Sequence, residues 1–596
     1  MDAQHNREQL QSDGIVEGFL VKIQKTEKPE LSEQTIELTT KKISLTIQEI
    51  DSDFQNINWQ AKKAKVSTNF FTIKPQVKSR LLTIANSWEL AYKLRKRLAS
   101  EILHIEPLLS LTVPPLGVSE TLQDSHLTKS KKIDWSLEQI NVTKVWKKFF
   151  LESKPGLDVI IGHPDTHYLI HPELDDNLDN VDLATMLKFI ESNHQILNPL
   201  TNEGIVSSPT HGTATASVII SAPGVLQKIA KNENIPTITG VAYGSELIPL
   251  PVGSSFANLD IFDPSLARAI KFAADQGVDI ISISVGGLPS WRLHQAIKYA
   301  HQKGVIILAA AGNRLPFVVW PAAYKEVIAV ASSNADGKVS QSSSSGSQID
   351  IAAPGESIWC ANFEKDKNNQ WKLDSKAEGF VGRASGTSFA VAFTAGVAAL
   401  WLSYWSKHYK DKDNLHKLCG GKENIPLIFK QILDQADTVP TPDGYTWNRN
   451  YGKGIIDAEQ ILQFDPVKFR KNNNLEPISS QNFEHTLESM NLNSELMKEI
   501  RSGSLNTILD KLFNKSGDEL RSCLQEIGQE LAFNIYRYPE QNFHEKLHET
   551  LISQNSDPNS SEQLEKLKPE LKKMREFLLS EEERENVSEK LRSYLA

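Results

Sequence analysis

The chain has 596 residues, of which 65 are Lys or Arg and 74 are Asp or Glu, so its net charge is −9. This balance excludes a protein that binds nucleic acid through a strongly basic surface, and a 40% apolar content is typical of globular domains. The length leaves room for about four domains. Three cysteines without Cys-x-x-Cys spacing argue against both a disulfide framework and a structural zinc site.

The N-terminal residues lack the basic start, the apolar stretch and the small-residue cleavage site of a secretory signal peptide. The longest apolar stretch, 391–405, contains Thr394, Gly396 and Ser403 and is interpreted as a buried helix. We therefore expect no membrane contact. The expected location is the cytoplasm, or a compartment reached by a route that needs no N-terminal signal peptide.

Residues 1–132 form the first of three regions, and 66–113 carry a small α+β pattern within it. The pattern has two extended runs around a helical run, at 69–74, 88–99 and 102–111. Asn86 and Glu89 have the spacing of a capping box at the start of that helix. The residues that follow, 113–132, are rich in proline and hydroxyl side chains, which is typical of an exposed linker.

In the second region, 133–463, short apolar runs alternate with helical stretches. The runs have the character of buried parallel strands and lie at 159–161, 278–285, 305–310, 327–331 and 349–351. This order predicts a doubly wound, mostly parallel α/β sheet, which binds its ligands at the carboxyl ends of the strands. Functional residues are therefore expected directly after each run.

The third region, 464–596, is rich in Leu, Glu, Lys, Asn and Ser and contains amphipathic stretches, which predict an all-α module. Its charged residues are interpreted first as solvated helix faces. The alternative is that these helices bind a protein partner.

Four motifs in the middle region place reactive or polar side chains after these runs. Asp165 follows the first strand, His211 begins a stretch of small residues, and Asn313 follows an alanine run. Ser388 stands at the start of the most apolar helix, where the helix dipole favours negative charge. Each motif alone has a structural explanation, such as a turn, a core histidine or an N-cap. Their joint occurrence indicates a catalytic site.

These motifs resemble those of the subtilisin-like serine peptidases, the subtilases, over about 135–462. The matching stretches, in the family's order, are Asp165-Thr166 with His171-Pro172-Glu173-Leu174, then His211-Gly212-Thr213, and then Gly386-Thr387-Ser388. The order Asp, His, Ser distinguishes subtilisins from the other serine hydrolases that share this triad.

The resemblance implies a subtilisin-like fold and a role for each motif. Asp165 would orient His211, His211 would activate Ser388 as the nucleophile, and the Asn313 amide would stabilise the oxyanion. The substrate backbone would pair, as an added strand, with Ser284, Val285 and Gly286.

The chain departs from the family pattern at four positions: His167 for glycine, Ala214 and Thr215 for His-Val, and Ala392 for proline. None of these removes a member of the triad. Many subtilases bind calcium, and five acidic residues crowd the loop after the aspartate motif: Glu173, Asp175, Asp176, Asp179 and Asp182. A solvated acidic loop is the preferred explanation, so we predict no metal and no cofactor and leave calcium open.

The predicted function is a serine endopeptidase that acts on protein or peptide substrates through an acyl-enzyme. Two alternatives stay open: a pseudo-protease that binds peptides as a scaffold, and a peptide ligase that transfers the same acyl group to an amine. The N-terminal α+β unit and its linker resemble a subtilase propeptide, and a permanently attached accessory domain explains them equally well.

Overall fold

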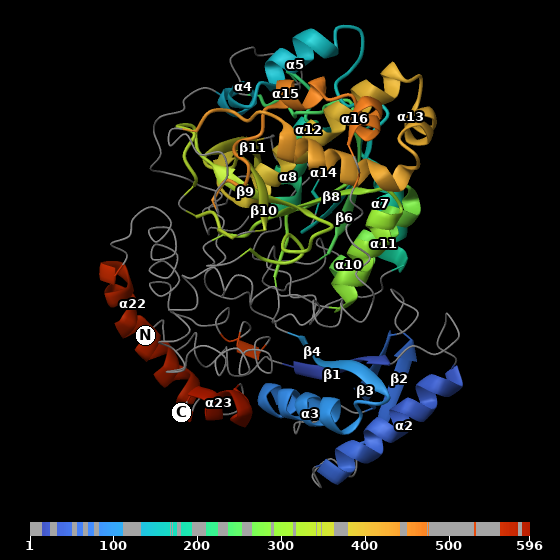
Figure 1. The fold of residues 1–596 in the computed structure, drawn as a ribbon, viewed down its shortest axis with the longest axis vertical. Coiled ribbons are helices and arrows are strands. Elements are labelled where there is room, and N and C mark those ends of the chain that lie inside the picture. Colours follow the sequence, from blue (N-terminus) through green and yellow to red (C-terminus); the bar gives the residue numbers. More distant parts are fainter. Residues whose placement is uncertain are drawn as a thin grey trace.

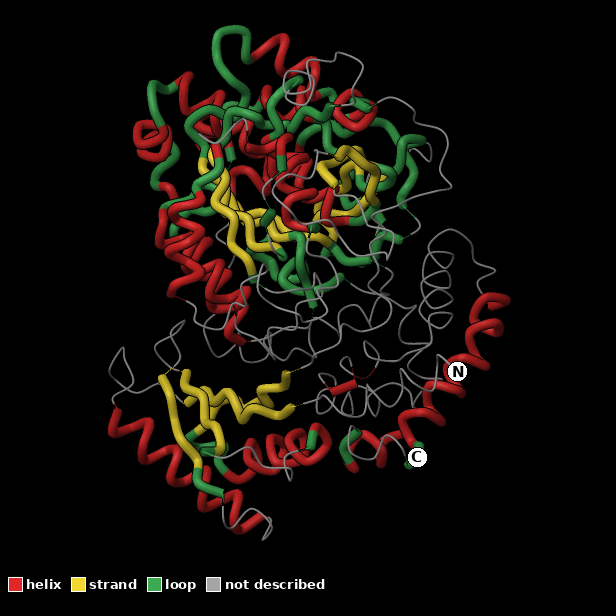
Figure 2. The backbone as a smooth tube through the Cα atoms, turned by 180° about the vertical axis from the view of Figure 1, so that it is seen from behind, coloured by secondary structure: helices red, strands yellow, loops and turns green. Residues whose placement is uncertain are grey.

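The structure is a computed structural model, in which the N-terminal sheet and the large central sheet lie apart from each other (Figure 1, Figure 2). The residues that it describes are 15–23, 33–50, 57–63, 70–76, 83–110, 133–166, 168–169, 171–175, 180–192, 210–224, 237–252, 265–287, 291–313, 318–340, 342–346, 348–362, 380–441, 450–473, 475, 530–531, 534, 561–581 and 587–595.

The N-terminal unit is a four-stranded antiparallel sheet with two helices on one side (Figure 1). Its elements are β1 (Ile15–Ile23), α2 (Glu33–Ile50), β2 (Trp59–Lys63), β3 (Phe70–Pro75), α3 (Ile84–Arg97) and β4 (Ile102–Ser110). The spatial order is β2-β3-β1-β4. Phe19 and Phe71 from the sheet and Trp88 from α3 are almost fully buried in its core. The described part of the unit thus extends back to residue 15, well before the 66–113 range expected from the sequence.

Helix α3 begins earlier than the sequence analysis predicted. Its N-cap is Thr83, whose hydroxyl accepts a hydrogen bond from the Asn86 N–H at 3.1 Å. Asn86 therefore lies inside the first turn, and the predicted capping box with Glu89 is wrong. The Glu89 carboxylate instead accepts from the N–H of Lys590, near the end of the chain, at 2.8 Å.

The central unit is built on a six-stranded sheet of order β10-β9-β8-β7-β5-β6, in which all neighbouring strands are parallel. Its strands are β5 (Ile160–Asp165), β6 (Glu246–Pro251), β7 (Ile280–Ile283), β8 (Ile306–Ala310), β9 (Ile328–Ser333) and β10 (Ile349–Pro354). Strands β11 (Ile358–Asn362) and β12 (Phe380–Ala384) pair as a separate antiparallel ribbon.

Helices cover both faces of this sheet. Helix α8 (His211–Ile220) packs on α12 (Thr387–His408), and α12 lies against β7 to β10. On the opposite face, α10 (Ser265–Gln276) contacts β5 and packs on α11 (Trp291–Gln302), and α14 (Ile425–Gln435) contacts β8 and β10. The predicted doubly wound, mostly parallel α/β class is confirmed.

The remaining helices are α4 (Trp135–Gln139), α5 (Val142–Phe149), α6 (Pro172–Asp175), α7 (Leu183–Ser192), α13 (Lys412–Leu418), η3 (Lys422–Asn424), α15 (Ala458–Gln463), α16 (Pro466–Asn472), α22 (Ser561–Leu579) and α23 (Glu589–Leu595). In the described part of the chain, one helix, α12, is long and apolar enough to cross a membrane. However, 94% of its most apolar window is buried inside the protein, as in a core helix.

The C-terminal helices contact the N-terminal unit through a buried carboxylate (Figure 1). Glu530 is fully buried, accepts hydrogen bonds from the N–H and hydroxyl of Ser588 at 2.7 Å each, and accepts one from the Tyr92 hydroxyl of α3 at 2.9 Å. Burial raises the pKa of Glu530 to about 7, although these hydrogen bonds act in the opposite direction. The N-terminal unit and the C-terminal helices therefore meet at a carboxyl group whose raised pKa lies near neutral pH.

We expect this contact to weaken as the pH rises from 5 to 8. Because the folded pKa of about 7 exceeds the reference value of 4.5, the stabilisation is complete below pH 4.5 and is lost as the pH rises through 7. The difference corresponds to about 3 kcal/mol. Amide hydrogen exchange of residues 587–595, corrected for the intrinsic exchange rate, measures the strength of this contact at each pH. The protein carries Ser388→Ala for this experiment. Glu530→Gln should make the protection independent of pH, and equal pH dependence in both proteins would contradict the assignment.

Candidate active site

Asp165 lies at the carboxyl end of β5, where the parallel sheet delivers its functional side chains. Successive strand residues face opposite sides of a sheet, and a Cβ at Gly162 would meet Ala273 of α10. His163 and Asp165 therefore face the other side, toward α8. Asp165 is 1% exposed.

The Asp165 carboxylate is held by three donors that approach both of its oxygens. Oδ1 accepts from the Thr166 N–H and from Nδ1 of His211, both at 2.6 Å. Oδ2 accepts from the Thr215 hydroxyl at 2.9 Å. Burial raises the pKa of Asp165, but the adjacent His211, together with His163 and the Thr166 N–H, outweighs burial and holds the pKa at about 2. The carboxylate is therefore charged throughout the neutral range.

His211 is the first residue of α8, and every residue of this helix is buried. The small side chains that follow His211 let α8 pack closely on α12 and on β5. Thr213 ties the helix to the loop after β5, because its hydroxyl accepts from the Leu169 N–H at 2.8 Å and donates to the Leu169 carbonyl at 3.2 Å. The imidazole is thus fixed by its helix as well as by Asp165.

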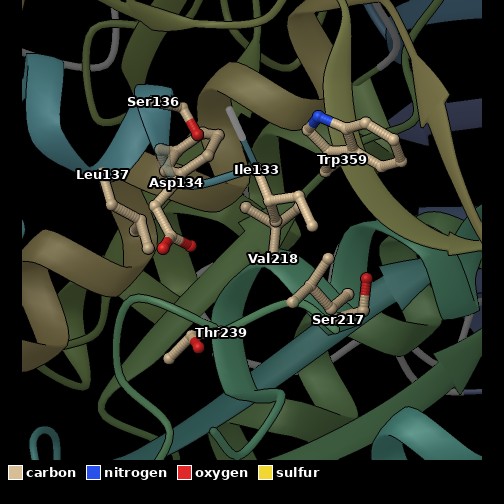
Figure 3. A pocket seen from close by; sticks show the side chains of 10 residues that line it. Ile133, Asp134, Ser136, Leu137, Ser217, Val218, Thr239 and Trp359 are labelled. Carbon is tan, nitrogen blue, oxygen red and sulfur yellow. The ribbon is translucent and has the colours of Figure 1, made fainter. Parts of the chain in front are cut away.

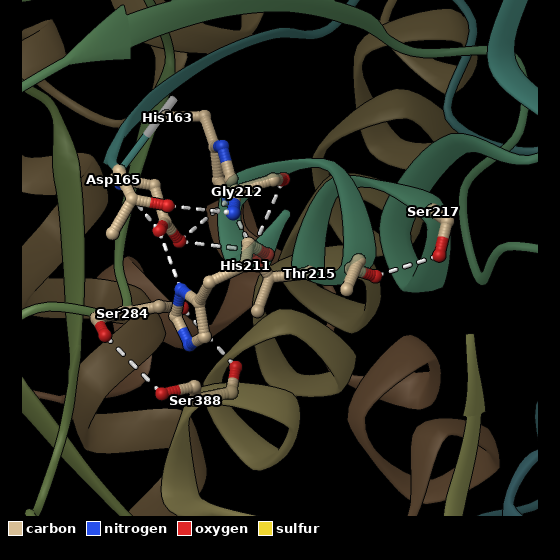
Figure 4. Close-up of polar contacts among 10 residues, drawn as sticks. His163, Asp165, His211, Gly212, Thr215, Ser217, Ser284 and Ser388 are labelled. Atoms are coloured by element: carbon tan, nitrogen blue, oxygen red, sulfur yellow. Dashed lines mark hydrogen bonds and ion pairs between the residues drawn. The ribbon is translucent and has the colours of Figure 1, made fainter. Parts of the chain in front are cut away.

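Ser388 is the second residue of α12, and Thr387 separates it from the N-cap Gly386. Its hydroxyl donates to the Ser284 carbonyl at 3.2 Å, and the Ser284 hydroxyl donates to the Ser388 carbonyl at 3.1 Å. In Figure 4 the imidazole of His211 lies between the Asp165 carboxylate and the Ser388 side chain. The His211 ring also contacts the ring of Phe389, the next residue of α12, at a centroid distance of 6.4 Å.

The turn before Ser388 requires close backbone approach. The Gly386 N–H donates to the Gly355 carbonyl at 2.7 Å, and a Cβ at Gly355 would lie 2.4 Å from the Ser332 hydroxyl oxygen. Strand β10 and the start of α12 are thereby fixed to each other. The first turn of α12 points its backbone N–H groups and its positive dipole end toward the site.

Asn313 follows β8 and is oriented by the residue that precedes Ser388. Its Oδ1 accepts from the Thr387 N–H at 2.9 Å and from the Thr387 hydroxyl at 3.2 Å, and that hydroxyl accepts from the Gly312 N–H at 3.2 Å. Because the oxygen end of the amide is used in this way, the Nδ2 end is the one that can donate to a substrate oxygen.

The segment 284–286 follows β7, which ends at Ile283, earlier than the apolar run 278–285 expected from the sequence. Beyond it, Gly287 pairs with Trp320 through two backbone hydrogen bonds of 2.9 and 3.0 Å. A Cβ at Gly286 would lie 2.7 Å from Cγ2 of Val319, so only glycine fits there without movement. The structure thus brings Ser284 to Ser388 and fixes the backbone of the proposed substrate strand from one side.

Two residues that the sequence analysis did not assign to the site also contact it. His163 and Thr215 lie next to Asp165, and His163 is on the side of Asp165 away from Ser388 (Figure 4). The signals were a histidine two residues before Asp165 in a buried strand, and a threonine four residues after His211 on the same helix face. Of the other departures, Ala392 is buried within α12, and His167 lies outside the described residues.

Two of the acidic residues after the aspartate motif, Glu173 and Asp182, accept hydrogen bonds from the protein. Glu173 accepts from the Thr237 hydroxyl at 3.0 Å and from the Ile238 N–H at 3.3 Å, and burial raises its pKa to about 7. Asp182 accepts from the Thr185 N–H. Among the described residues, no group of three or more His, Cys, Asp or Glu side chains is placed to hold a metal ion. Asp176 and Asp179 lie outside the described residues, so the prediction of no metal, with calcium left open, is not tested.

A small pocket on α8 is separate from these residues (Figure 3). It is lined by Ser217 and Val218 of α8, Trp359 of β11 and four residues near α4, Ile133, Asp134, Ser136 and Leu137. None of the proposed catalytic or substrate-binding residues lines it. It is therefore no part of the candidate active site.

Comparison with known proteins identifies the central unit. The model of the subtilase family matches residues 156–454, half of the chain. The major intracellular serine protease of Bacillus subtilis is 32% identical over 38% of this chain and 65% of its own length. Thermitase of Thermoactinomyces vulgaris is 38% identical over 23% of this chain and 46% of its own length. Subtilisin of Bacillus pumilus is 28% identical over 48% of this chain and 91% of its own length.

The crystal structure of fervidolysin from Fervidobacterium pennivorans matches with 20% identity and a TM-score of 0.48, covering 76% of this chain and 62% of that one. Of the curated relatives, the chain spans less than two thirds of the length of the Bacillus subtilis protease and of thermitase. The segment matched by the family model contains all the residues proposed for the site, from Asp165 to Ser388. This match confirms the resemblance seen in the motifs, and the chain belongs to the subtilase family.

Proposed function

We propose that the protein is a serine endopeptidase that cleaves peptide bonds through an acyl-enzyme on Ser388. The observation that carries this proposal is the buried 2.6 Å hydrogen bond between Asp165 and Nδ1 of His211, with the opposite side of the imidazole facing Ser388 (Figure 4). A carboxylate on Nδ1 fixes the tautomer that leaves Nε2 as a base. That base lies beside a hydroxyl at a helix N-terminus, which is the arrangement that a serine nucleophile needs.

The proposed reaction moves one proton and exchanges one bond in each half. The hydroxyl proton of Ser388, directed at the Ser284 carbonyl in the resting protein, passes to Nε2 of His211 as Oγ attacks the peptide carbonyl. The C–N bond then breaks, and His211 gives the proton to the leaving amine. Water attacks the acyl-enzyme in the second half, again with His211 as the base, and Ser388 is regenerated.

Charge that develops on the carbonyl oxygen is stabilised by donors that are already oriented. The Nδ2 group of Asn313 is aimed by the bonds between its Oδ1 and Thr387, and the Ser388 N–H lies at the start of α12. Both donors are held before the substrate arrives, so little reorganisation is needed during the reaction.

A peptide substrate is proposed to bind in an extended form along Ser284, Val285 and Gly286. Ser284 is bonded to Ser388 in both directions, so a strand added here places its carbonyl group next to the nucleophile. The proposed location is the cytoplasm, which is consistent with the name of the Bacillus subtilis relative, an intracellular protease.

The N-terminal unit is proposed to act as a propeptide. Its β-α-β-β-α-β order forms a compact domain of its own, and it precedes the central unit by a linker that lies outside the described residues. The proposal is that the peptidase itself cuts this linker.

The first test is covalent labelling by a fluorophosphonate. Wild-type protein is expected to be labelled once per chain, and Ser388→Ala and His211→Ala to lose the label with unchanged circular dichroism. Ser403→Ala serves as a control, because Ser403 is a buried serine of the same helix that bonds the Leu157 carbonyl. Labelling that survives in Ser388→Ala would refute the assigned nucleophile.

The second test concerns the oxyanion donor. Asn313→Ala is expected to lower kcat with little change in KM, because the oxyanion exists only after attack. In a subtilisin the loss of such an amide lowers turnover by about 10²- to 10³-fold, and we adopt that measured value as the expected size.

The matched control for Asn313→Ala is Asn334→Ala. The Asn334 amide likewise accepts backbone hydrogen bonds, from Asp336 and Lys338 at 3.0 Å each, but belongs to a turn after β9. A change in KM without a fall in kcat, or equal effects of Asn313→Ala and Asn334→Ala, would contradict the proposed role.

The third test addresses the propeptide. Intact masses of purified wild-type protein and Ser388→Ala are compared. Cleavage within 111–132 in the wild type alone supports self-processing at the linker. Identical intact masses favour a permanently attached domain.

A further inference from the structure

A buried histidine and threonine lie behind the proposed catalytic carboxylate. Nε2 of His163 is 3.2 Å from the Thr215 hydroxyl oxygen, which lies 2.9 Å from Oδ2 of Asp165 (Figure 4). The same Nε2 is 3.6 Å from Oδ2 itself. His163 is 1% exposed and Thr215 is fully buried, so both side chains lie away from the bulk solvent.

The direction of this chain of hydrogen bonds follows from the single proton of the threonine hydroxyl. The possible acceptors around it are Oδ2 of Asp165 and the carbonyls of His211 and Gly212, at 2.9, 3.1 and 3.2 Å. The carboxylate is both the nearest acceptor and the charged one, so it takes the proton. The threonine oxygen is then an acceptor toward His163, whose Nε2 must carry hydrogen.

We propose that His163 and Thr215 are positioning residues of the peptidase site, which hold the Asp165 carboxylate through the relay His163 Nε2–H to Thr215 Oγ1–H to Asp165 Oδ2. This inference rests on the proposed function for its kinetic consequences. It extends the three-residue site inward by two hydrogen bonds, so that both carboxylate oxygens are fixed: Oδ1 by His211 and Thr166, and Oδ2 by Thr215.

The surroundings keep His163 neutral while it does this. The titratable groups that face it are Asp165 on its own strand and His211 on α8. Burial lowers the pKa of His163, His211 acts in the same direction, and Asp165 opposes them without reversing the shift. A neutral His163 leaves the negative charge of Asp165 available to the imidazolium that forms on His211 during each half-reaction.

The relay also gives a structural reason for Thr215, one of the departures from the family pattern. Polar groups on a buried strand and a buried helix cost free energy unless each is hydrogen-bonded. His163 and Thr215 satisfy each other and the carboxylate, whereas an aliphatic residue at either position would leave the other without this partner. The pair is thus coupled to the site, beyond filling space in the core.

The kinetic test uses Thr215→Val, which keeps the shape and removes the hydroxyl. Loss of a hydrogen bond to a charged group predicts a fall of about 10- to 100-fold in kcat with KM nearly unchanged. Because Asp165 then keeps more of its charge for His211, the acid limb of the pH profile of kcat/KM should move to higher pH. Thr215→Ser should restore both kcat and the position of the acid limb.

The control is Thr394→Val. Thr394 is a buried threonine of α12 that bonds the Ala390 carbonyl at 2.9 Å and has no contact with Asp165. Rates are divided by the fraction of protein that a fluorophosphonate labels, so that misfolded protein does not count. A Thr215→Val profile that matches wild type or Thr394→Val in the position of its acid limb overturns the proposal.

A second measurement does not depend on activity, and it is made on protein in which His163 and Thr215 are unchanged. The ¹⁵N chemical shifts of His163 in the full chain carrying Ser388→Ala should show hydrogen on Nε2, with His163→Gln identifying the signal. Hydrogen on Nδ1 alone overturns the relay even if the peptidase activity is established. If wild-type protein hydrolyses no peptide, the proposed function fails, and this tautomer still decides the hydrogen-bond chain.

Discussion

The structure of the site depends on one interaction, the buried hydrogen bond between the Asp165 carboxylate and Nδ1 of His211. A carboxylate that is 1% exposed is costly unless donors surround it. Here the backbone of Thr166, the hydroxyl of Thr215 and the imidazole of His211 supply them, and the pKa of Asp165 falls to about 2 in spite of burial. The same bond that stabilises the charge also sets which ring nitrogen of His211 faces Ser388.

The parallel sheet makes this arrangement possible. Strands β5, β7 and β8 end at one edge and deliver Asp165, Ser284 and Asn313 there. Helices α8 and α12, packed on each other over the same face, bring His211 and Ser388 to that edge from their first turns. Backbone contacts that only glycine permits, at Gly355 and Gly286, fix the turns between them.

The strands that carry the site could be predicted from the sequence because each is a short apolar run buried on both faces. Strand β6 was missed because Pro249 and Pro251 interrupt its pattern. It is the edge strand of the sheet, where the missing N–H groups of proline are tolerated. In the N-terminal unit, β1 and α2 were missed, since a short amphipathic strand and a charged helix give a weak local signal.

The motifs identified the reactive side chains, but their supporting contacts could not be predicted. His163 and Thr215 are 52 positions apart and meet only because β5 and α8 pack together. Tyr92 and Glu530, 438 positions apart, meet through the docking of the C-terminal helices on the N-terminal unit. Spacing along the chain identifies residues that share a strand face or a helix face, whereas contacts between elements depend on the tertiary packing.

The most direct measurement of the central claim is a crystal structure of the protein after reaction with a fluorophosphonate. The account predicts a phosphonyl group on Oγ of Ser388, with Nε2 of His211 within hydrogen-bond distance and the phosphonyl oxygen facing Nδ2 of Asn313. A phosphonyl group on any other residue, or an imidazole that has left Asp165 and lies out of reach of Ser388, would contradict it.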